Sequence, residues 1–289
     1  MIGKKPEEWL KVTKNGLFVV PGNFFVDPNA ASDMAVITHA HADHARSGHK
    51  RVISTPETLA IMKVRFGESF SPSPYGLKYG KKLKINDVMI WLAPAGHVLG
   101  SAQIVIEYEG SRVVVSGDYK RQADSTCRPF EVVNCDVFIT EATFGLPVFK
   151  HPKAQIEIKK LLNSIDLFNN RCHVIGTYAL GKAQRVISLL RESGYHQPIF
   201  IHGALRKLCD LYVEHGIDLG ELCPVPDSRK KPGVLDLDGQ IVLAPPSAIA
   251  DRWVRKLGNP VIVLASGWMR IKQRARQRNV DLPLVISDH

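Results

Sequence analysis

The sequence has few cysteines, and none of them is paired in a way that suggests a disulfide framework or a zinc knuckle. Its five cysteines are scattered singly along the chain, at Cys127, Cys135, Cys172, Cys209 and Cys223. No two of them have the CxxC spacing of cysteine zinc sites, and their number is odd. This distribution favours reduced thiols and excludes a small disulfide-stabilised fold.

Long apolar runs are also missing. No run approaches the roughly 20 residues that a membrane-spanning helix needs, and the charged N-terminal stretch 1–16 lacks the apolar core of a signal peptide. These absences predict a cytoplasmic protein. With 289 residues, 45% of them hydrophobic, the chain can form one large domain or two ordinary ones.

Acidic residues are outnumbered by basic ones. The chain has 38 Lys and Arg against 28 Asp and Glu, which gives a formal net charge of +10. Such an excess is typical of proteins that bind polyanions, chiefly nucleic acid. Residues 270–278 (RIKQRARQR) are rich in Arg and Lys and contain no acid, which predicts phosphate binding by Arg274 and Arg276. The same pattern also fits a solvated helix face.

The hydrophobic pattern changes near residue 150. Before this point, short apolar runs separated by turns predict strands, and several of them stop at a His, Asp or Glu. After it, strands alternate with amphipathic helices, which is typical of parallel α/β units. The last run, 282–289, reads as a strand that ends at Asp288 and His289.

Four metal-ligand side chains follow one of the early strands, in the stretch ITHAHADHARSGH: His39, His41, Asp43 and His44. Residues two apart at the end of an extended strand point to the same side. Neutral imidazole and carboxylate are zinc ligands, whereas an unpaired group of them in a core would be costly. The HxHxDH pattern therefore predicts a metal site. His49 lies outside this spacing and is expected at the surface or behind the ligands.

Three residues elsewhere in the chain could complete the site, one before the HxHxDH motif and two after it. His97 lies between two apolar runs, Asp118 follows a β-branched strand and a glycine, and Asp27 precedes a proline. Taken singly, each also fits an ordinary loop or turn residue.

In this order, the residues resemble the metallo-β-lactamase fold, an αββα sandwich of the α/β class. The resemblance implies two zinc ions, with manganese as an alternative. It implies a first zinc held by His39, His41 and His97, and a second held by Asp43 and His44. Asp118 would bridge the two ions, and Asp27 would orient the histidines.

The later segments resemble the β-CASP nucleases, in which an inserted α/β domain covers the metal site. Glu141 in FITEATFG and His289 in VISDH match the acidic residue and late histidine that pair in that group. The resemblance implies a first domain over 1–149, an insert over 150–267, and a return to the first domain over 268–289. Since the family continues past this point, the chain is expected to be truncated at its C-terminus.

Several residues are predicted to bind substrate. The stretch GTYALGKAQRV combines a strand, a glycine-containing loop and a helix start, which suits phosphate binding by backbone N–H groups, although an ordinary strand–helix turn looks the same. Trp268 could stack a base or lie in the core. Besides Arg274 and Arg276, the predicted substrate-binding residues are Ser101, Lys120, Tyr178, Lys182 and Arg185.

The segments PAGHVLGSAQI, VVVSGDYKRQADSTCRPFE and YALGKAQR resemble the bacterial DNA ligase-associated exonucleases, relatives of the cross-link-repair nucleases and Artemis. That resemblance covers nearly the whole chain. It implies a 5′ exonuclease that processes DNA ends in repair, with zinc-activated hydroxide as nucleophile and His289 as proton donor. DNA is the implied substrate and a DNA ligase the implied partner.

Three alternatives remain at this point. An RNA-processing nuclease of the same fold would use the same ligands. A small-molecule thioester or lactam hydrolase would explain HxHxDH but not Glu141, the insert or the positive charge. A non-catalytic nucleic-acid-binding subunit would be expected to have lost metal ligands, which this chain keeps through Asp118.

Overall fold

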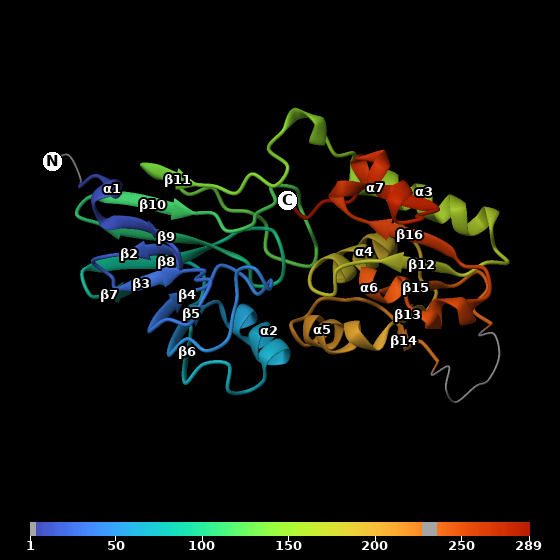
Figure 1. Cartoon of the computed structure of the whole chain (residues 1–289), viewed down its shortest axis with the longest axis horizontal. Coiled ribbons are helices and arrows are strands. Elements are labelled where there is room, and N and C mark those ends of the chain that lie inside the picture. Colours follow the sequence, from blue (N-terminus) through green and yellow to red (C-terminus); the bar gives the residue numbers. More distant parts are fainter. Residues whose placement is uncertain (1–3, 227–235) are drawn as a thin grey trace. The chain divides into compact units, whose positions relative to one another are not determined.

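The computed structural model describes residues 4–226 and 236–289 and divides the chain into two units (Figure 1). The first comprises Met1–Thr143 together with His289, and the second comprises Phe144–Asp288. These borders differ from the predicted ones at 149/150 and 267/268. Residues 268–288 group with the second unit because β17 (Leu282–Leu284) pairs with β16 (Val261–Ala265) in that unit's sheet. His289 alone groups with the first unit.

The first unit contains two β-sheets. The six-stranded sheet has the order β1-β2-β3-β4-β5-β6, with strands Leu10–Thr13, Gly16–Val19, Phe24–Val26, Met34–Val36, Arg51–Ser54 and Ser73–Gly76. The five-stranded sheet has the order β11-β10-β9-β8-β7, with β7 to β11 at Leu83–Ile85, Val88–Pro94, Ala102–Tyr108, Ser111–Val115 and Val137–Ile139. The mixed α/β architecture confirms the predicted fold class.

One hydrophobic core joins these two sheets. In β8, the side chains of Val88, Ile90 and Leu92 are buried in this core, while the alternate residues Met89 and Trp91 are only half-buried. This alternation is the period-2 pattern of a strand with one face toward a core. The core also includes residues of the six-stranded sheet, which shows that the two sheets pack as a sandwich.

Only two helices belong to the described part of the first unit, α1 (Pro6–Trp9) and α2 (Pro56–Phe66). Thr55 caps α2, because its side chain accepts a hydrogen bond from the backbone N–H of Thr58. Pro56 occupies the first helical turn, where its missing N–H costs nothing. The face of the five-stranded sheet that points away from the shared core is covered by the segment around Val133 and Cys135. No helix of the described first unit belongs to this cluster.

Several strands of the sandwich end at one edge. Strands β3 and β4 are parallel, and β8, β10 and β11 also share one direction, because β8 and β10 are both antiparallel to β9. At this edge the backbone N–H of Ala102 in β9 donates to the carbonyl of Thr38, which follows β4. The polar residues after these strands therefore come together.

The second unit is a parallel sheet with helices. Its strand order is β14-β13-β15-β12-β16-β17, and the strands not yet named are β12 (His173–Gly176), β13 (Ile199–Ile201), β14 (Leu222–Pro224) and β15 (Ile241–Ala244). The helices are α3 (Ala154–Leu167), α4 (Lys182–Glu192), α5 (Gly203–Glu214), α6 (Pro246–Ile249) and α7 (Lys272–Gln277), with short 3₁₀ turns η1 (Pro147–Phe149), η2 (Arg252–Leu257) and η3 (Gly267–Arg270). All its strand pairs are parallel, as the alternation of strands and helices predicts.

One predicted element of this unit differs from the structure, because the strand expected over 282–289 ends at Leu284. None of the helices in the described part of the chain combines the length and the apolar character that crossing a membrane requires.

Candidate metal centre

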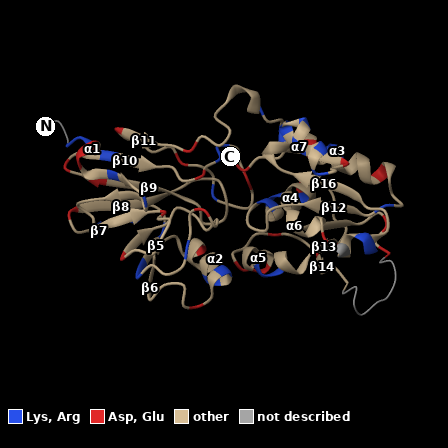
Figure 2. Ribbon diagram, viewed as in Figure 1, with Lys and Arg blue, Asp and Glu red and all other residues tan. Residues whose placement is uncertain are grey.

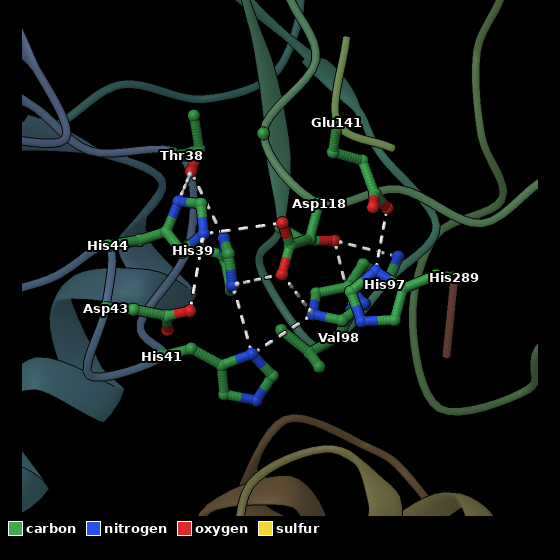
Figure 3. A network of polar contacts seen from close by, with 12 residues as sticks. Thr38, His39, His41, Asp43, His44, His97, Val98, Asp118, Glu141 and His289 are labelled. Atoms are coloured by element: carbon green, nitrogen blue, oxygen red, sulfur yellow. Dashed lines mark hydrogen bonds and ion pairs between the residues drawn. The ribbon is translucent and has the colours of Figure 1, made fainter. Parts of the chain in front are cut away.

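Three histidines and one aspartate meet at the edge of the sandwich where the strands end (Figure 3). One ligand atom from each of His39, His41, His97 and Asp118 lies within 4.8 Å of all the others. The Nδ1 atom of His41 lies 3.0 Å from Nε2 of His39 and 3.1 Å from Nε2 of His97. Asp118 Oδ2 lies 3.6 Å from the first of these Nε2 atoms and 3.7 Å from the second.

These residues fit a divalent metal ion. Ligand atoms around a tetrahedral zinc with Zn–N bonds near 2.05 Å lie about 3.3 Å apart, close to the four distances above. Two neutral imidazole nitrogens at this distance either share an N–H or, when both present lone pairs, are stabilised by a cation between them. Burial, together with the neighbouring His41 and His97, lowers the pKa of His39 well below its usual range. His39 is therefore neutral, the form that binds metals.

Asp27 and Thr38 contact the Nδ1 atoms of His44 and His39, on the opposite side of each ring from Nε2. The carboxylate of Asp27 accepts hydrogen bonds from the Thr38 backbone N–H at 2.8 Å and from the Thr38 hydroxyl at 2.5 Å. It also lies 2.8 Å from Nδ1 of His44. Asp27 has a left-handed φ of 43°, a conformation that is rare outside glycine and concentrates at functional sites.

The Thr38 hydroxyl sets the tautomer of His39. Because its single proton is donated to Asp27, its oxygen accepts from Nδ1 of His39, 3.1 Å away. The other ring nitrogen, Nε2, then carries the lone pair that faces the cluster. Gly117 makes room for this hydroxyl: a Cβ atom there would lie 2.7 Å from the Thr38 side chain, at a φ of +56°. Sequence reasoning missed Thr38, although its place between a strand and HxHxDH is a usable signal.

A second group of ligand atoms adjoins the first through Asp118. His44 Nε2 lies 3.3 Å from Oδ1 of Asp118 and 3.9 Å from the exposed carboxylate of Asp43. Burial opposes protonation of His44, but hydrogen bonds to Asp118 and Asp27 outweigh it and raise its pKa to about 10. Burial likewise opposes ionisation of Asp118, but the hydrogen bond and charge of His44 lower its pKa to about 2. Without a metal, Asp118 and Asp27 therefore stabilise positive charge on His44. A second cation at Asp118, Asp43 and His44 would take the place of the proton on Nε2 of His44.

Glu141 and His289, which are 148 residues apart, meet beside this cluster. Nδ1 of His289 lies 2.7 Å from the Glu141 carboxylate, and its ring lies 4.9 Å from the ring of His97 (Figure 3). The backbone N–H of Thr143 also donates to Glu141, at 3.0 Å. Burial raises and these hydrogen bonds lower the pKa of Glu141, with a net shift below its usual value. Glu141 is therefore an ionised acceptor that orients the imidazole.

Ser101 and Lys120, two predicted substrate-binding residues, are buried in the first unit. The Ser101 hydroxyl accepts from the backbone N–H groups of His97 and Val98, both at 3.1 Å, so it shapes the loop that carries His97. The Lys120 ammonium is ion-paired with the buried carboxylate of Asp124. Neither polar group is presented at the surface of the described chain, which favours structural roles for both.

The predicted substrate-binding residues of the second unit fall into two groups. Lys182 and Arg185 are buried and bind the carboxylate of Asp288 at 2.9 and 3.1 Å. Their charges are therefore paired within the protein rather than exposed to a substrate. Tyr178 is 57% exposed. Arg274 and Arg276 are exposed on α7, and the Arg274 guanidinium lies 4.1 Å from the ring centroid of the half-buried Trp268.

Two histidines outside the cluster have structural positions. His49 is fully buried, and its Nδ1 lies 3.0 Å from the Ser32 hydroxyl, so the first of its two expected positions, at the surface, is wrong. His202 caps α5 by accepting from the backbone N–H of Ala204.

Comparison with known proteins connects this geometry to a family. The endoribonuclease YSH1 of Gibberella zeae is 31% identical over 241 residues, which are 68% of this chain and 28% of that protein. The chain belongs to the metallo-β-lactamase/β-CASP family. A probable DNA ligase of Opitutus terrae is 26% identical over 292 residues, 97% of this chain and 27% of that protein. This β-CASP chain therefore spans little more than a quarter of the length of either relative.

No family model matches the chain. The fold of this β-CASP protein also occurs in a crystal structure of a protein of unknown function from Enterococcus faecalis V583. The TM-score is 0.54 over 89% of this chain and 70% of that one, at 12% identity.

Proposed function

We propose that this chain is a metal-dependent nuclease that hydrolyses DNA phosphodiester bonds, acting as a 5′ exonuclease in the processing of DNA ends. The observation that carries the proposal is the Glu141–His289 pair, 2.7 Å apart, beside two groups of metal ligands that share Asp118. A hydrolase of small, neutral substrates needs no such pair. The names of the relatives, a DNA ligase and an endoribonuclease, also favour nucleic acid.

Two zinc ions, or manganese, would be held by His39, His41 and His97 on one side and by Asp43 and His44 on the other, with Asp118 shared. When bound, they supply positive charge for the phosphate and acidify a water. The protein orients its own ligands: Asp27 and Thr38 fix the rings of His39 and His44, and Ser101 fixes the loop of His97. Such support determines how well a metal site performs.

His289 would donate the proton that the leaving alkoxide requires. A phosphodiester is a poor electrophile with a poor leaving group, so a positioned acid is expected to contribute about 10²- to 10⁴-fold to the rate. Glu141 accepts from Nδ1 of His289 and stabilises the imidazolium form. This assignment gives Nε2 the role of delivering the proton.

Nucleic-acid binding is assigned to the second unit. Figure 2 shows Lys and Arg gathered on α7, where Lys272, Arg274 and Arg276 are exposed. Arg274 stacked on Trp268 resembles the arrangements that proteins use to hold unpaired bases. The net charge of +10 agrees with a polyanionic substrate. A DNA ligase remains the proposed protein partner.

RNA cleavage is the second candidate function, because the relative that is 31% identical carries the name endoribonuclease. One experiment decides between the two. The protein is added, with zinc or manganese, to 5′-phosphorylated single-stranded DNA and RNA of equal length in one tube, and the products are separated on a denaturing gel. DNA shortened from its 5′ end with RNA spared supports the proposal. Preferential cutting of RNA replaces it with the RNA-processing function, and cleavage that persists in His39→Ala refutes the metal centre.

The role of α7 has its own test. Arg274→Gln with Arg276→Gln should raise KM and flatten its dependence on salt, because a strand bound by fewer cations releases fewer counterions. A matched control is Arg206→Gln with Lys207→Gln on α5, which removes the same charge from another helix of this unit. Equal KM values and salt dependence in the two double variants would show that α7 is a solvent-exposed helix with no specific role in substrate binding.

A further inference from the structure

The segment after β17 is held by side chains rather than by a sheet. Residues 285–288 form no strand, yet Ile286, Ser287 and Asp288 are buried. Two helices supply the partners. Glu157 of α3 accepts from the backbone N–H of Val285 at 2.8 Å, and Lys182 of α4 donates to the carbonyl of Ile286 at 2.6 Å.

The strongest of these contacts involve Asp288. Its Oδ1 atom lies 2.9 Å from the Lys182 ammonium and 3.1 Å from the Arg185 guanidinium, and Arg185 also donates to the carbonyl of Ser287. The side chains of Lys182, Arg185 and Asp288 are 3, 5 and 9% exposed. We call these three residues the Asp288 latch. Ion pairs this buried are strongly coupled, because removing one member leaves an uncompensated charge.

The two cations of the latch stand where a helix does not favour them. Lys182 and Arg185 lie in the first turn of α4, three residues apart and on one face. Positive charge in the first turn opposes the helix dipole. A carboxylate at that position reverses the penalty, and Asp288 supplies it. The pairing therefore compensates the two positive charges at the start of this helix.

The residue that follows the latch is His289. Consecutive Cα atoms are about 3.8 Å apart, so the latch holds the residue that is joined directly to His289 by a peptide bond. We propose that Lys182 and Arg185 are positioning residues, which hold Asp288 and thereby set the direction of His289 as proton donor. This inference rests on the proposed function for its kinetic consequences and on the contacts of Asp288 for its structural ones.

Steady-state kinetics separates positioning from direct substrate binding. Lys182→Met and Asp288→Asn should each lower kcat by about 10- to 100-fold, the loss expected when a reacting group is misplaced by about 1 Å, with KM for the oligonucleotide unchanged. Lys182→Arg should restore most of kcat. In a His289→Ala background, neither substitution should lower kcat further, because the group they position is gone.

The matched control is Lys160→Met. Lys160 is another lysine of the same unit, and it donates to the carbonyl of Pro283 in β17, just before the terminal segment, at 2.6 Å. It does not contact Asp288, so kcat should stay at the wild-type value. A raised KM with normal kcat in Lys182→Met, or an undiminished loss in the His289→Ala background, would overturn the latch.

A second measurement works without activity. The ring signal of His289 is observed by NMR on protein labelled with ¹³C in histidine and is identified by its loss in His289→Ala. Lys182→Met and Asp288→Asn should shift or broaden this signal, whereas Lys160→Met should leave it in place. An unchanged signal in both latch variants, each verified as folded by circular dichroism, refutes the inference. If the wild type cleaves neither DNA nor RNA, the proposed function is refuted. The NMR signal of His289 then still tests whether Lys182 and Asp288 position that residue.

Discussion

Replacing Thr38 with valine should weaken metal binding while leaving every metal ligand in the chain. Valine keeps the shape of threonine but removes the hydroxyl, which donates to Asp27 at 2.5 Å and accepts from Nδ1 of His39 at 3.1 Å. Asp27 retains two donors, the Thr38 backbone N–H and His44. Nδ1 of His39 loses its acceptor, so the tautomer with Nε2 facing the cluster is no longer favoured.

Two lines of reasoning give the same size of effect. A hydrogen bond to a charged group is worth about 1.5–3 kcal/mol, and at about 1.4 kcal/mol for each factor of ten this is roughly 10- to 100-fold in affinity. Mutation of groups that orient metal ligands typically costs about 10- to 100-fold in metal affinity. We therefore expect the zinc dissociation constant of Thr38→Val to rise by about that factor.

The assay is a competition titration against a chromophoric zinc chelator, with thermal unfolding measured on the same samples. Thr58→Val is the matched control: Thr58 is also fully buried, and its hydroxyl donates to the carbonyl of Gly100 at 2.9 Å, away from the ligands. It should lose about 1 kcal/mol of stability and keep the wild-type zinc affinity. A zinc affinity of Thr38→Val within twofold of the wild type, or an equal loss in Thr58→Val, would refute the role given to this hydroxyl.

Three further predictions concern the metal content, the pH and a buried ion pair. Elemental analysis of zinc-loaded protein should find two ions per chain, and about one in Asp43→Ala with His44→Ala; an unchanged ratio would contradict the shared arrangement at Asp118. In metal-free protein, the stability that His44 contributes is fully present below its ordinary pKa of 6.5 and should be lost as the pH rises through its folded value of about 10. The melting temperature in EDTA should fall across that window, and His44→Gln should flatten the curve; parallel curves would exclude His44 as the cause. Asp124→Ala should cost about 3–5 kcal/mol in urea unfolding, because it leaves the Lys120 ammonium buried without its carboxylate, and a cost below about 1 kcal/mol would show that Lys120 reaches solvent.

The class of fold and the set of candidate metal ligands could both be predicted from the amino-acid sequence. HxHxDH follows a short strand, and ligands that lie close together in the chain are brought together by local geometry alone. His97 and Asp118 could be added only through the resemblance to a known family, since each by itself also fits an ordinary loop or turn residue. The structure shows that they follow β8 and β10, two strands that share a direction. The parallel α/β character of residues after about 150 is equally local, since it depends on the spacing of apolar residues.

Only the three-dimensional packing shows which of the predicted polar residues are buried against protein partners. Lys120, Lys182 and Arg185 read as substrate-binding cations in the sequence, yet each is buried against a carboxylate. Arg185 meets Asp288 across 103 positions of the chain, a separation at which no periodicity carries information. Thr38 acquires its role only when Asp27 folds back to accept its proton. A buried charge needs an ion-pair partner because packing has removed the water that would otherwise solvate it. Which charges are buried depends on the tertiary structure.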